Sequence, residues 1–294
     1  MTQPLEGLIT KGVGGFYTAV APDGCAHTLR AQAKLRRQKL TPMVGDHVRF
    51  QPGPEGEEGW LMAILPRKNS LTRPPVANID KVLLVVAAAS PEADLLLLDR
   101  MLLAARQAGI SPVVAVNKAD LDPEKAEAIR SAYQGAAEGA FLVSARSGEG
   151  VDALREALSG SVHALAGQSG AGKSTLINRL YGLKLVTGQV SRIERGKHTT
   201  RHSELIRLPG GGMVLDTPGF SLLESQLLEP IHLKESYPEF APYEGNCRFS
   251  PCAHASEPGC AVREAVGGAI DPGRHERYKI LFDEMTQRWK DRYD

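Results

Sequence analysis

The chain has 294 residues, of which 42% are hydrophobic and 23% charged, and its formal net charge is +1. This composition is ordinary for a globular protein and excludes nucleic-acid binding driven by overall charge, so any basic surface must be local. The longest apolar runs, such as Val82 to Ala89, fall far short of the ~20 residues that span a bilayer, and Met1 to Glu6 lacks the pattern of a secretory signal. We therefore expect a cytoplasmic, monomeric protein of more than one domain that has no membrane partner.

Residues 1–72 predict a small β-barrel. Short β-like stretches at 15–20, 46–50 and 59–64 are separated by turns rich in Gly and Pro. The five-stranded oligonucleotide-binding (OB) barrel is the leading candidate for such a segment.

A basic cluster lies between two of these stretches. Residues 29–39 contain no acidic residue and carry five cations: Arg30, Lys34, Arg36, Arg37 and Lys39. Such a cluster is suited to RNA phosphates, but a solvated loop has the same composition, and the sequence leaves both interpretations open.

Residues 73–228 predict an α/β domain. Short apolar strands alternate with amphipathic helices, which is typical of βαβ units and a mainly parallel sheet. The expected strands are 81–87, 112–116, 140–143, 162–166 and 213–215, and the expected helices begin near Asp94, Asp122, Asp152 and Thr175.

A phosphate-binding loop follows the strand at 162–166. The motif G-x-x-x-x-G-K-[ST] is matched between that strand and a helix, which is the context that makes it credible. Lys173 is expected to reach the β- and γ-phosphates and Ser174 to ligate Mg²⁺. The loop consists of Gly167, Gln168, Ser169, Gly170, Ala171, Gly172, Lys173, Ser174 and Thr175.

Two further motifs indicate that the bound base is guanine. The N-K-x-D motif follows the strand at 112–116, and its aspartate would accept hydrogen bonds from two donors that adenine lacks. An S-A dipeptide follows the next strand and would contact guanine through its backbone. The residues are Asn117, Lys118 and Asp120 in the first motif, and Ser144 and Ala145 in the second.

The switch motifs come last. In the D-x-x-G motif that follows the strand at 213–215, Asp216 would hold Mg²⁺ through water and Gly219 would sense the γ-phosphate. In the polar stretch at 196–200, we favour Thr200 over Thr199 as the second Mg²⁺ ligand.

The order of these motifs differs from that of conventional GTPases. The guanine-reading motifs precede the phosphate loop, whereas the loop, the switch threonine and D-x-x-G keep their usual order. The chain is therefore expected to be a circular permutation, which domains tolerate because their termini lie close together at the surface.

Residues 229–294 predict an irregular zinc-binding domain that ends in a helix near 272–293. Three thiols and one imidazole, from Cys247, Cys252, His254 and Cys260, make a complete tetrahedral set for one structural Zn²⁺. A disulfide with a spare thiol, or unrelated buried cysteines, are the alternatives.

Together the barrel, the permuted motifs and the cysteine cluster resemble the bacterial small-ribosomal-subunit-dependent GTPase A (RsgA) family over nearly the whole chain. The resemblance also rests on Gly45-Asp46 in the barrel. It implies an OB barrel, GTP hydrolysis stimulated by the small ribosomal subunit, binding to its rRNA, and a role in late maturation of that subunit.

The water-positioning group is not supplied by the usual residue. Many small GTPases place a glutamine directly after D-x-x-G, where this chain has Phe220. His198 in the switch segment is the candidate, which the family resemblance supports, although a solvated loop histidine is the alternative.

Gly170 stands where some GTPases carry a potassium-binding asparagine, so potassium activation is not assumed. His163, within a strand, is expected to be structural.

Two functions follow from these expectations. The first is a GTP hydrolase, with GTP and GDP as substrate and product, Mg²⁺ as cofactor, and the small subunit and its rRNA as partners. The second is a GTP-dependent RNA-binding placeholder with little hydrolysis of its own. A zinc-dependent RNA-processing enzyme is disfavoured because the cluster leaves no open metal position.

Overall fold

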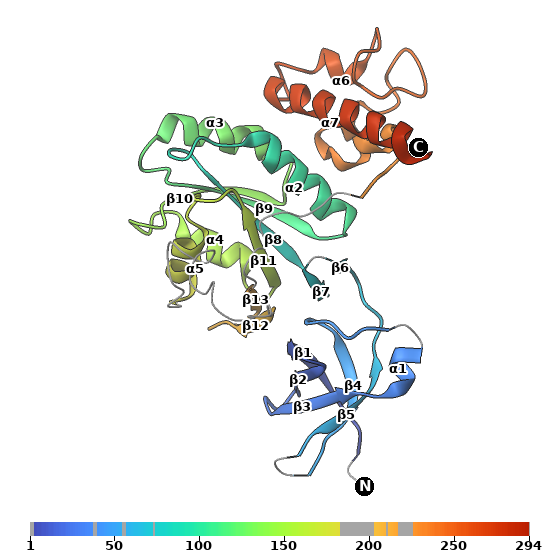
Figure 1. Cartoon of the computed structure of the whole chain (residues 1–294). Coiled ribbons are helices and arrows are strands. Elements are labelled where there is room, and N and C mark those ends of the chain that lie inside the picture. The colour runs from blue at the N-terminus through green and yellow to red at the C-terminus, as the bar shows by residue number, and fades with distance from the viewer. Residues whose placement is uncertain are drawn as a thin grey trace.

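A computed structural model describes residues 3–37, 40–54, 57–72, 74–182, 203–209, 211–216 and 226–293. A barrel, an α/β sheet and a helical module follow one another from the N-terminus to the C-terminus (Figure 1). The fold class predicted from the sequence is confirmed in this order of parts.

The N-terminal barrel is closed. Its order β1-β2-β3-β5-β4 returns to β1 through a pairing between β1 and β4, the closed five-stranded arrangement of an OB fold. A short helix, α1 (Ala33–Arg37), connects β3 to β4. The strands are β1 (Leu5–Val13), β2 (Phe16–Val20), β3 (Ala26–Ala31), β4 (His47–Gln51) and β5 (Gly59–Ile64).

Strands β1 and β3 were not predicted from the sequence. The pairing of β1 with β2 shifts register between Ile9 and Lys11, which breaks the alternation that identifies a strand. Strand β3 fully buries only Leu29. The basic segment, for which the sequence left an RNA-binding cluster and a solvated loop open, is partly the end of β3, with Arg30 on it, and partly α1, with Lys34 and Arg37 on it.

The barrel core consists of the inward side chains of these strands. Ile9, Leu29, Val48, Phe50 and Leu61 have no exposed surface. Burying each such side chain stabilises the fold by about 1.5–3 kcal/mol.

The central sheet has the order β10-β9-β8-β11-β13-β12. Its strands are parallel except β12, which is antiparallel to β13. The strands are β8 (Lys81–Ala87), β9 (Ser111–Asn117), β10 (Gly139–Val143), β11 (Val162–Gly167), β12 (Glu204–Arg207) and β13 (Met213–Asp216).

Helices cover both faces of this sheet (Figure 1). Leu84 of β8 packs in the cluster that includes α2 and α3, whereas its neighbours Leu83 and Val85 pack in the cluster that includes α4 and α5. Burial on both faces explains why the strands are continuous apolar runs. The helices are α2 (Leu95–Gln107), α3 (Pro123–Tyr133), α4 (Val151–Leu158) and α5 (Lys173–Tyr181).

A group of polar contacts lies where the loop before β4 meets the hairpin of β6 (Ser70–Thr72) and β7 (Pro75–Ala77), which leads from the barrel to the central sheet. We refer to these contacts as the joint. Asp46 is fully buried and accepts hydrogen bonds from Arg67 Nε at 2.6 Å, from Arg67 Nη2 at 2.8 Å and from the Met43 backbone at 2.8 Å. Gly45 has φ +90°, and a Cβ there would lie 2.0 Å from the carbonyl oxygen of Ala77. The joint therefore requires glycine at position 45, because a Cβ there would collide with the Ala77 carbonyl.

The barrel also touches the sheet at its edge. Lys11 of β1 pairs with Glu204 of β12 in an antiparallel bridge, and the Lys11 ammonium lies 2.8 Å from the Glu204 carboxylate. Barrel and central sheet thus form one continuous set of paired strands.

The C-terminal module is mainly helical and irregular, as predicted. Its core includes Leu233, Phe240, Tyr278, Leu281 and Met285. Among the described residues no helix is long and apolar enough to cross a membrane. The elements of the C-terminal module are the 3₁₀ helices η1 (Pro230–Ser236), η2 (Pro238–Tyr243) and η3 (Asp291–Tyr293) and the α-helices α6 (Ala261–Glu264) and α7 (Pro272–Lys290).

A buried ionic cluster holds this module against α2. The carboxylate of Asp99 on α2 is fully buried and binds Arg274 Nη1 at 2.5 Å and Arg277 Nε at 2.6 Å, both on α7. Arg274 also binds Glu239 at 2.5 Å. Burial alone would lower the pKa of Arg274, but the two carboxylates outweigh it and raise that pKa. The interface therefore depends on a group of paired charges whose centre, Asp99 and Arg274, is buried.

Replacing Asp99 by Ala is expected to loosen the module. The change would leave two guanidinium groups without their buried partner, and breaking a buried pair in this way costs about 3–5 kcal/mol. The measurements are the urea midpoint of unfolding and hydrogen exchange across 229–293. The control is Glu284→Ala, which removes the half-exposed Arg100–Glu284 pair of the same interface and should cost less than about 1 kcal/mol. Equal shifts in the two variants would contradict the role given to Asp99.

Candidate functional site

The phosphate loop lies at the carboxyl end of β11, directly before α5. Gly167 has φ +142°, and a Cβ there would lie 2.2 Å from the carbonyl oxygen of Val85. Gly172 has φ +92° and directly precedes α5, which has no side-chain cap at its N-terminus. The uncapped N–H groups of the first helical turn are thus available to an anion.

The side chains of the loop suit a phosphate group. The ammonium group of Lys173 donates to the carbonyl oxygens of Gly167 at 2.7 Å and Gln168 at 2.8 Å, and burial lowers its pKa. Ser174 is half-buried and Thr175 exposed, both in the first turn of α5. A cation inside a ring of backbone groups at a helix N-terminus is a site for phosphate, with a hydroxyl beside it for a metal ion.

Asn117 joins three motifs that are far apart in the sequence. Its side chain is 2% exposed, and its Nδ2 donates to the Ala171 carbonyl of the phosphate loop at 2.8 Å. Its Oδ1 accepts from the backbone N–H of Ala145 in the S-A dipeptide at 3.0 Å. The first residue of N-K-x-D therefore holds the phosphate loop and the expected guanine loop together through one amide.

The neighbouring residues complete this arrangement. Lys118 has φ +61°, and its ammonium donates to the Gly170 carbonyl at 3.0 Å and to the Ser90 carbonyl. Asp120 is exposed in the turn that follows, and its carboxylate accepts no hydrogen bond within the described part of the chain. Ser144 is buried, and its hydroxyl accepts from the N–H of Ser147 at 3.1 Å. An open carboxylate beside a fixed loop is what recognition of a base edge requires.

One contact of the phosphate loop was not foreseen. Gln168 donates from Nε2 to the Glu92 carbonyl at 2.9 Å and accepts at Oε1 from the Asp94 N–H at 3.2 Å. Asp94 is the N-cap of α2, so the loop is tied to the start of that helix. The sequence contains no signal for this contact, because the partners are backbone atoms of a segment 74 and 76 residues away.

The switch residues are only partly described. Asp216 ends β13 at the same sheet edge as Gly167 and Asn117, as expected for a Mg²⁺-binding position. His198 and Thr200 lie outside the described residues, as do 196–199 and 217–220 with Gly219 and Phe220.

His163 is a structural residue, as the sequence predicted. It has no exposed surface and shares hydrogen bonds with Tyr181 Oη at 2.7 Å and Ser161 Oγ at 3.2 Å. Burial lowers its pKa to about 4, so it stays neutral at physiological pH.

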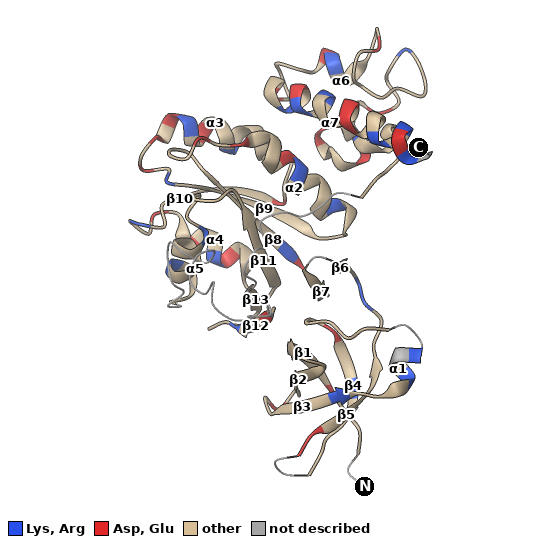
Figure 2. Ribbon diagram, in the orientation of Figure 1, with Lys and Arg blue, Asp and Glu red and all other residues tan. Residues whose placement is uncertain are grey.

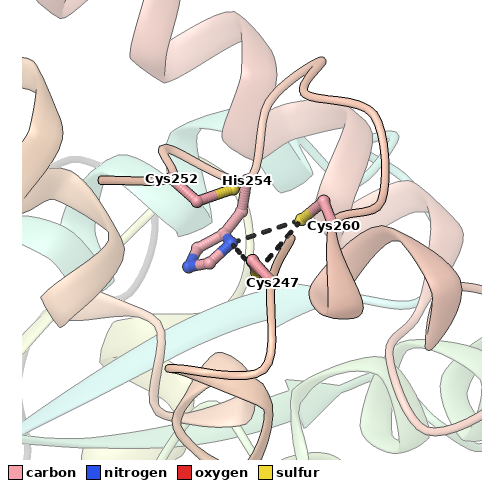
Figure 3. Close-up of side chains that lie close together, drawn as sticks. All are labelled: Cys247, Cys252, His254 and Cys260. Carbon is pink, nitrogen blue, oxygen red and sulfur yellow. Dashed lines mark hydrogen bonds between the residues drawn. The ribbon is translucent and has the colours of Figure 1, made fainter. Parts of the chain in front are cut away.

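A second site lies in the C-terminal module. Figure 3 shows Cys247, Cys252, His254 and Cys260 converging on one point, with their ligand atoms all within 4.8 Å of one another. His254 Nδ1 lies 3.3 Å from Cys260 Sγ and 3.6 Å from Cys247 Sγ, and the two sulfurs are 3.9 Å apart. Tetrahedral Zn²⁺ with bonds of about 2.3 Å would place its sulfur ligands about 3.8 Å apart, so this donor set fits zinc.

The disulfide alternative is not supported. All four cysteines of the chain are free, and the separation of Cys247 and Cys260 is far longer than a disulfide bond. Burial raises the pKa of Cys252 to about 12 and also raises that of Cys260. Buried thiols become ligands when a cation is present to stabilise the thiolate.

Glu244 orients the histidine of this cluster and was not identified from the sequence. Its Oε1 lies 2.9 Å from His254 Nε2, so the other ring nitrogen, Nδ1, faces the sulfurs. A carboxylate that accepts from the remaining ring N–H is the usual support of a metal-bound histidine. The sequence held no clue, because acidic residues are common near such clusters.

The backbone around His254 is fixed from α7. His254 has φ +60°, and its carbonyl lies 2.8 Å from His275 Nε2. The Tyr278 hydroxyl donates to the carbonyl of Ala253. The cluster and the helix that docks on α2 are thus parts of one packed unit.

Family comparisons agree with these geometries. Residues 64–226 match the model of the RsgA GTPase family, and residues 6–61 match the RsgA N-terminal domain. The "Small ribosomal subunit biogenesis GTPase RsgA" of Agathobacter rectalis is 40% identical, over 97% of this chain and 100% of that protein. The protein of the same name from Geobacillus sp. (strain WCH70) is 43% identical, over 98% of this chain and 99% of that protein.

Two solved structures are similar over the same length. YjeQ from Thermotoga maritima superposes with a TM-score of 0.84 at 35% identity, over 97% of this chain and 99% of that chain. YloQ, described as a circularly permuted GTPase, gives a TM-score of 0.80 at 32% identity, over 97% of this chain and 96% of that chain.

Replacing Cys260 by Ser is expected to abolish stoichiometric zinc binding. Three remaining donors bind more weakly, and loss of the ion should destabilise 229–293 by several kcal/mol, since binding to such sites supplies folding free energy. Metal analysis of the purified protein and hydrogen exchange across the module measure the two effects. Cys25→Ser, at the exposed cysteine outside the cluster, is the control and should keep one zinc per chain. Full zinc content in Cys260→Ser would rule out the assignment.

Proposed function

This chain belongs to the RsgA family of circularly permuted GTPases, and on that basis we propose that it hydrolyses GTP in the biogenesis of the small ribosomal subunit. It would bind the subunit and its rRNA, assist late maturation, and hydrolyse GTP faster when bound. The observation that carries the proposal is the Asn117 amide, which unites the expected guanine loop with the phosphate loop.

The nucleotide would be held between these two loops. Asp120 and the backbone of Ser144 and Ala145 would recognise guanine, while the loop at 167–175 with Lys173 would bind the phosphates. Ser174, Thr200 and, through water, Asp216 would hold the Mg²⁺ that a GTPase of this family uses. This ion would neutralise charge on the β- and γ-phosphates.

The four donors at 247–260 would hold one structural Zn²⁺. The supporting observation is a closed set of three sulfurs and one nitrogen, with Glu244 on the far nitrogen of the ring. These four protein donors would fill all four positions of a tetrahedral zinc site and leave none for a water molecule. The ion would therefore stabilise the module and not catalyse a reaction.

The hydrolytic water would be positioned by His198. Phe220 has no side-chain hydrogen-bonding group, so the residue after D-x-x-G cannot orient water, and the imidazole of His198 in the switch segment is the candidate replacement. A group that becomes correctly placed only on the small subunit would make hydrolysis depend on that partner. Weak hydrolysis with and without subunits would instead favour a GTP-dependent RNA-binding placeholder.

Replacing Asp120 by Ala is expected to weaken GTP binding by roughly 10²–10⁴-fold, because two hydrogen bonds to a charged acceptor are lost. Discrimination against ATP should fall with it, and calorimetric titration with both nucleotides measures the two effects. The matched control is Asp122→Ala, which removes the N-cap of α3 two residues further on. That variant should lose about 1 kcal/mol of stability and keep its GTP affinity. Unchanged GTP binding in Asp120→Ala would contradict the guanine assignment.

Steady-state GTP hydrolysis measured with and without small ribosomal subunits tests the proposed function. We expect the subunits to raise kcat, and we expect His198→Ala to lower the stimulated kcat by roughly 10²–10⁴-fold while the GTP affinity is nearly unchanged. His232→Ala, at an exposed histidine of the C-terminal module, is the control. Absence of stimulation in the unaltered protein would refute the main proposal, and an unchanged kcat in His198→Ala would remove that residue from the mechanism.

A further inference from the structure

The phosphate loop is held at two places by two different parts of the fold. Near its end, the amide of Asn117 in β9 binds the Ala171 carbonyl. Near its start, Gln168 binds the segment that leads into α2: its Nε2 donates to the Glu92 carbonyl at 2.9 Å, and its Oε1 accepts from the Asp94 N–H at 3.2 Å. Both ends of the Gln168 amide bind backbone atoms, so the start of the loop depends on the position of that segment.

The backbone of Gln168 also binds the cation of the site. Its carbonyl oxygen accepts from the Lys173 ammonium at 2.8 Å, and the Gly167 carbonyl accepts from the same ammonium at 2.7 Å. Lys173 is the residue expected to reach the β- and γ-phosphates. A displacement of Gln168 therefore moves one of the two oxygens that direct this ammonium, and groups that bind a ligand must be held to within about 0.5 Å.

The segment 90–94 packs on the phosphate loop at further points. The Lys118 ammonium donates to the carbonyls of Ser90 and Gly170, and so joins the segment to the loop. A Cβ on Gly170 would lie 3.4 Å from Cδ of Pro91, which is van der Waals contact. Loop and segment thus form one packed unit, and the segment leads directly into α2.

Helix α2 is also the element on which the C-terminal module docks. The buried carboxylate of Asp99 binds Arg274 at 2.5 Å and Arg277 at 2.6 Å, and Arg100 pairs with Glu284 at 2.5 Å. Figure 2 shows charged residues of both signs on α2 and α7, which lie next to each other. The position of α2 therefore depends on the docked module, because separating a buried carboxylate from its guanidinium partners is costly.

We propose that Gln168 is a positioning residue that makes the affinity for guanine nucleotide depend on the docking of the C-terminal module. The docked module holds α2, α2 holds the segment 90–94, and the segment holds the Gln168 side chain. The Gln168 carbonyl then keeps Lys173 directed at the phosphates. The inference rests on the nucleotide site proposed above, and it adds a route of control that includes neither the stretch 196–200 nor D-x-x-G.

This linkage acts in both directions. If docking strengthens nucleotide binding by a given factor, nucleotide binding strengthens docking by the same factor. The net contribution of one hydrogen bond changes an equilibrium constant by a factor of about 2 to 10, which sets the size of the effect. Bound GDP therefore protects the backbone of 229–293 from hydrogen exchange.

The test measures release of a GDP analogue that carries a methylanthraniloyl fluorophore, from the full-length protein without ribosomal subunits. Arg277→Ala removes one of the α7 partners of Asp99 and weakens docking, so we expect release to become about 2- to 10-fold faster. Gln168→Met keeps the length of the side chain and removes both of its hydrogen bonds. In the Gln168→Met background, Arg277→Ala should not speed release further, because the link to α2 is already broken.

Lys125→Ala is the matched control. It removes the 2.9 Å ion pair that ties Glu92 to α3, so it alters the same segment and leaves the Gln168 contacts in place. Arg277→Ala should still speed release in this background. Hydrogen exchange gives a second readout: GDP should protect 229–293 in the unaltered protein and in Lys125→Ala, but not in Gln168→Met.

Two results would overturn the proposal. One is an Arg277→Ala effect of equal size with and without Gln168→Met, since the two positions would then act independently. The other is unchanged release in a variant whose module is loosened by hydrogen exchange; if Arg277→Ala leaves the module protected, Asp99→Ala takes its place. Lack of stimulation by small subunits would count against the proposed function alone, because nucleotide release is measured without them.

Discussion

The proposed nucleotide site depends on the buried amide of Asn117. One side chain satisfies a carbonyl of the phosphate loop and an N–H of the S-A dipeptide, both shielded from water. Leaving such groups unpaired costs about 1–3 kcal/mol each, so the two loops keep a fixed spacing. The contact requires only that the ends of β9, β10 and β11 meet at one sheet edge. It does not depend on which strand comes first, and for this reason the permuted chain order leaves the site intact.

Helix α2 connects this site to the rest of the molecule. Its N-terminus is tied to the phosphate loop through Gln168, and its middle is tied to α7 through Asp99. The same α7 fixes the backbone that carries His254. A continuous set of hydrogen bonds and ion pairs therefore runs from the phosphate loop to the metal cluster, all within the described residues. The barrel is attached separately, through the hydrogen bond from Asn78 to the Gly45 carbonyl and through the pairing of Lys11 with Glu204.

Patterns of hydrophobicity predicted the parallel strands and the helices of the central domain, because these carry a strong local signal, whereas the antiparallel strand β12 was not predicted. The strand at 81–87 agrees with β8 to the residue, and the caps at Asp94 and Asp122 lie where the sequence placed them. The proposed nucleotide and zinc residues come from motif and spacing, and the structure brings the four proposed zinc ligands together. The barrel was harder to predict, since β1 contains an irregularity and β3 buries little. Glu244 and Asp99 were missed because long-range polar contacts leave no periodicity in the sequence.

The bridge between Lys11 and Glu204 lies at one border of the central sheet. Strand β12 would otherwise be the open border of the central sheet, with backbone N–H and C=O groups free to recruit a strand from another molecule. The barrel, which is closed on itself, covers part of that border and offers no free edge in exchange. The N-terminal barrel thus covers part of one border of the central sheet, while β10 forms the opposite border.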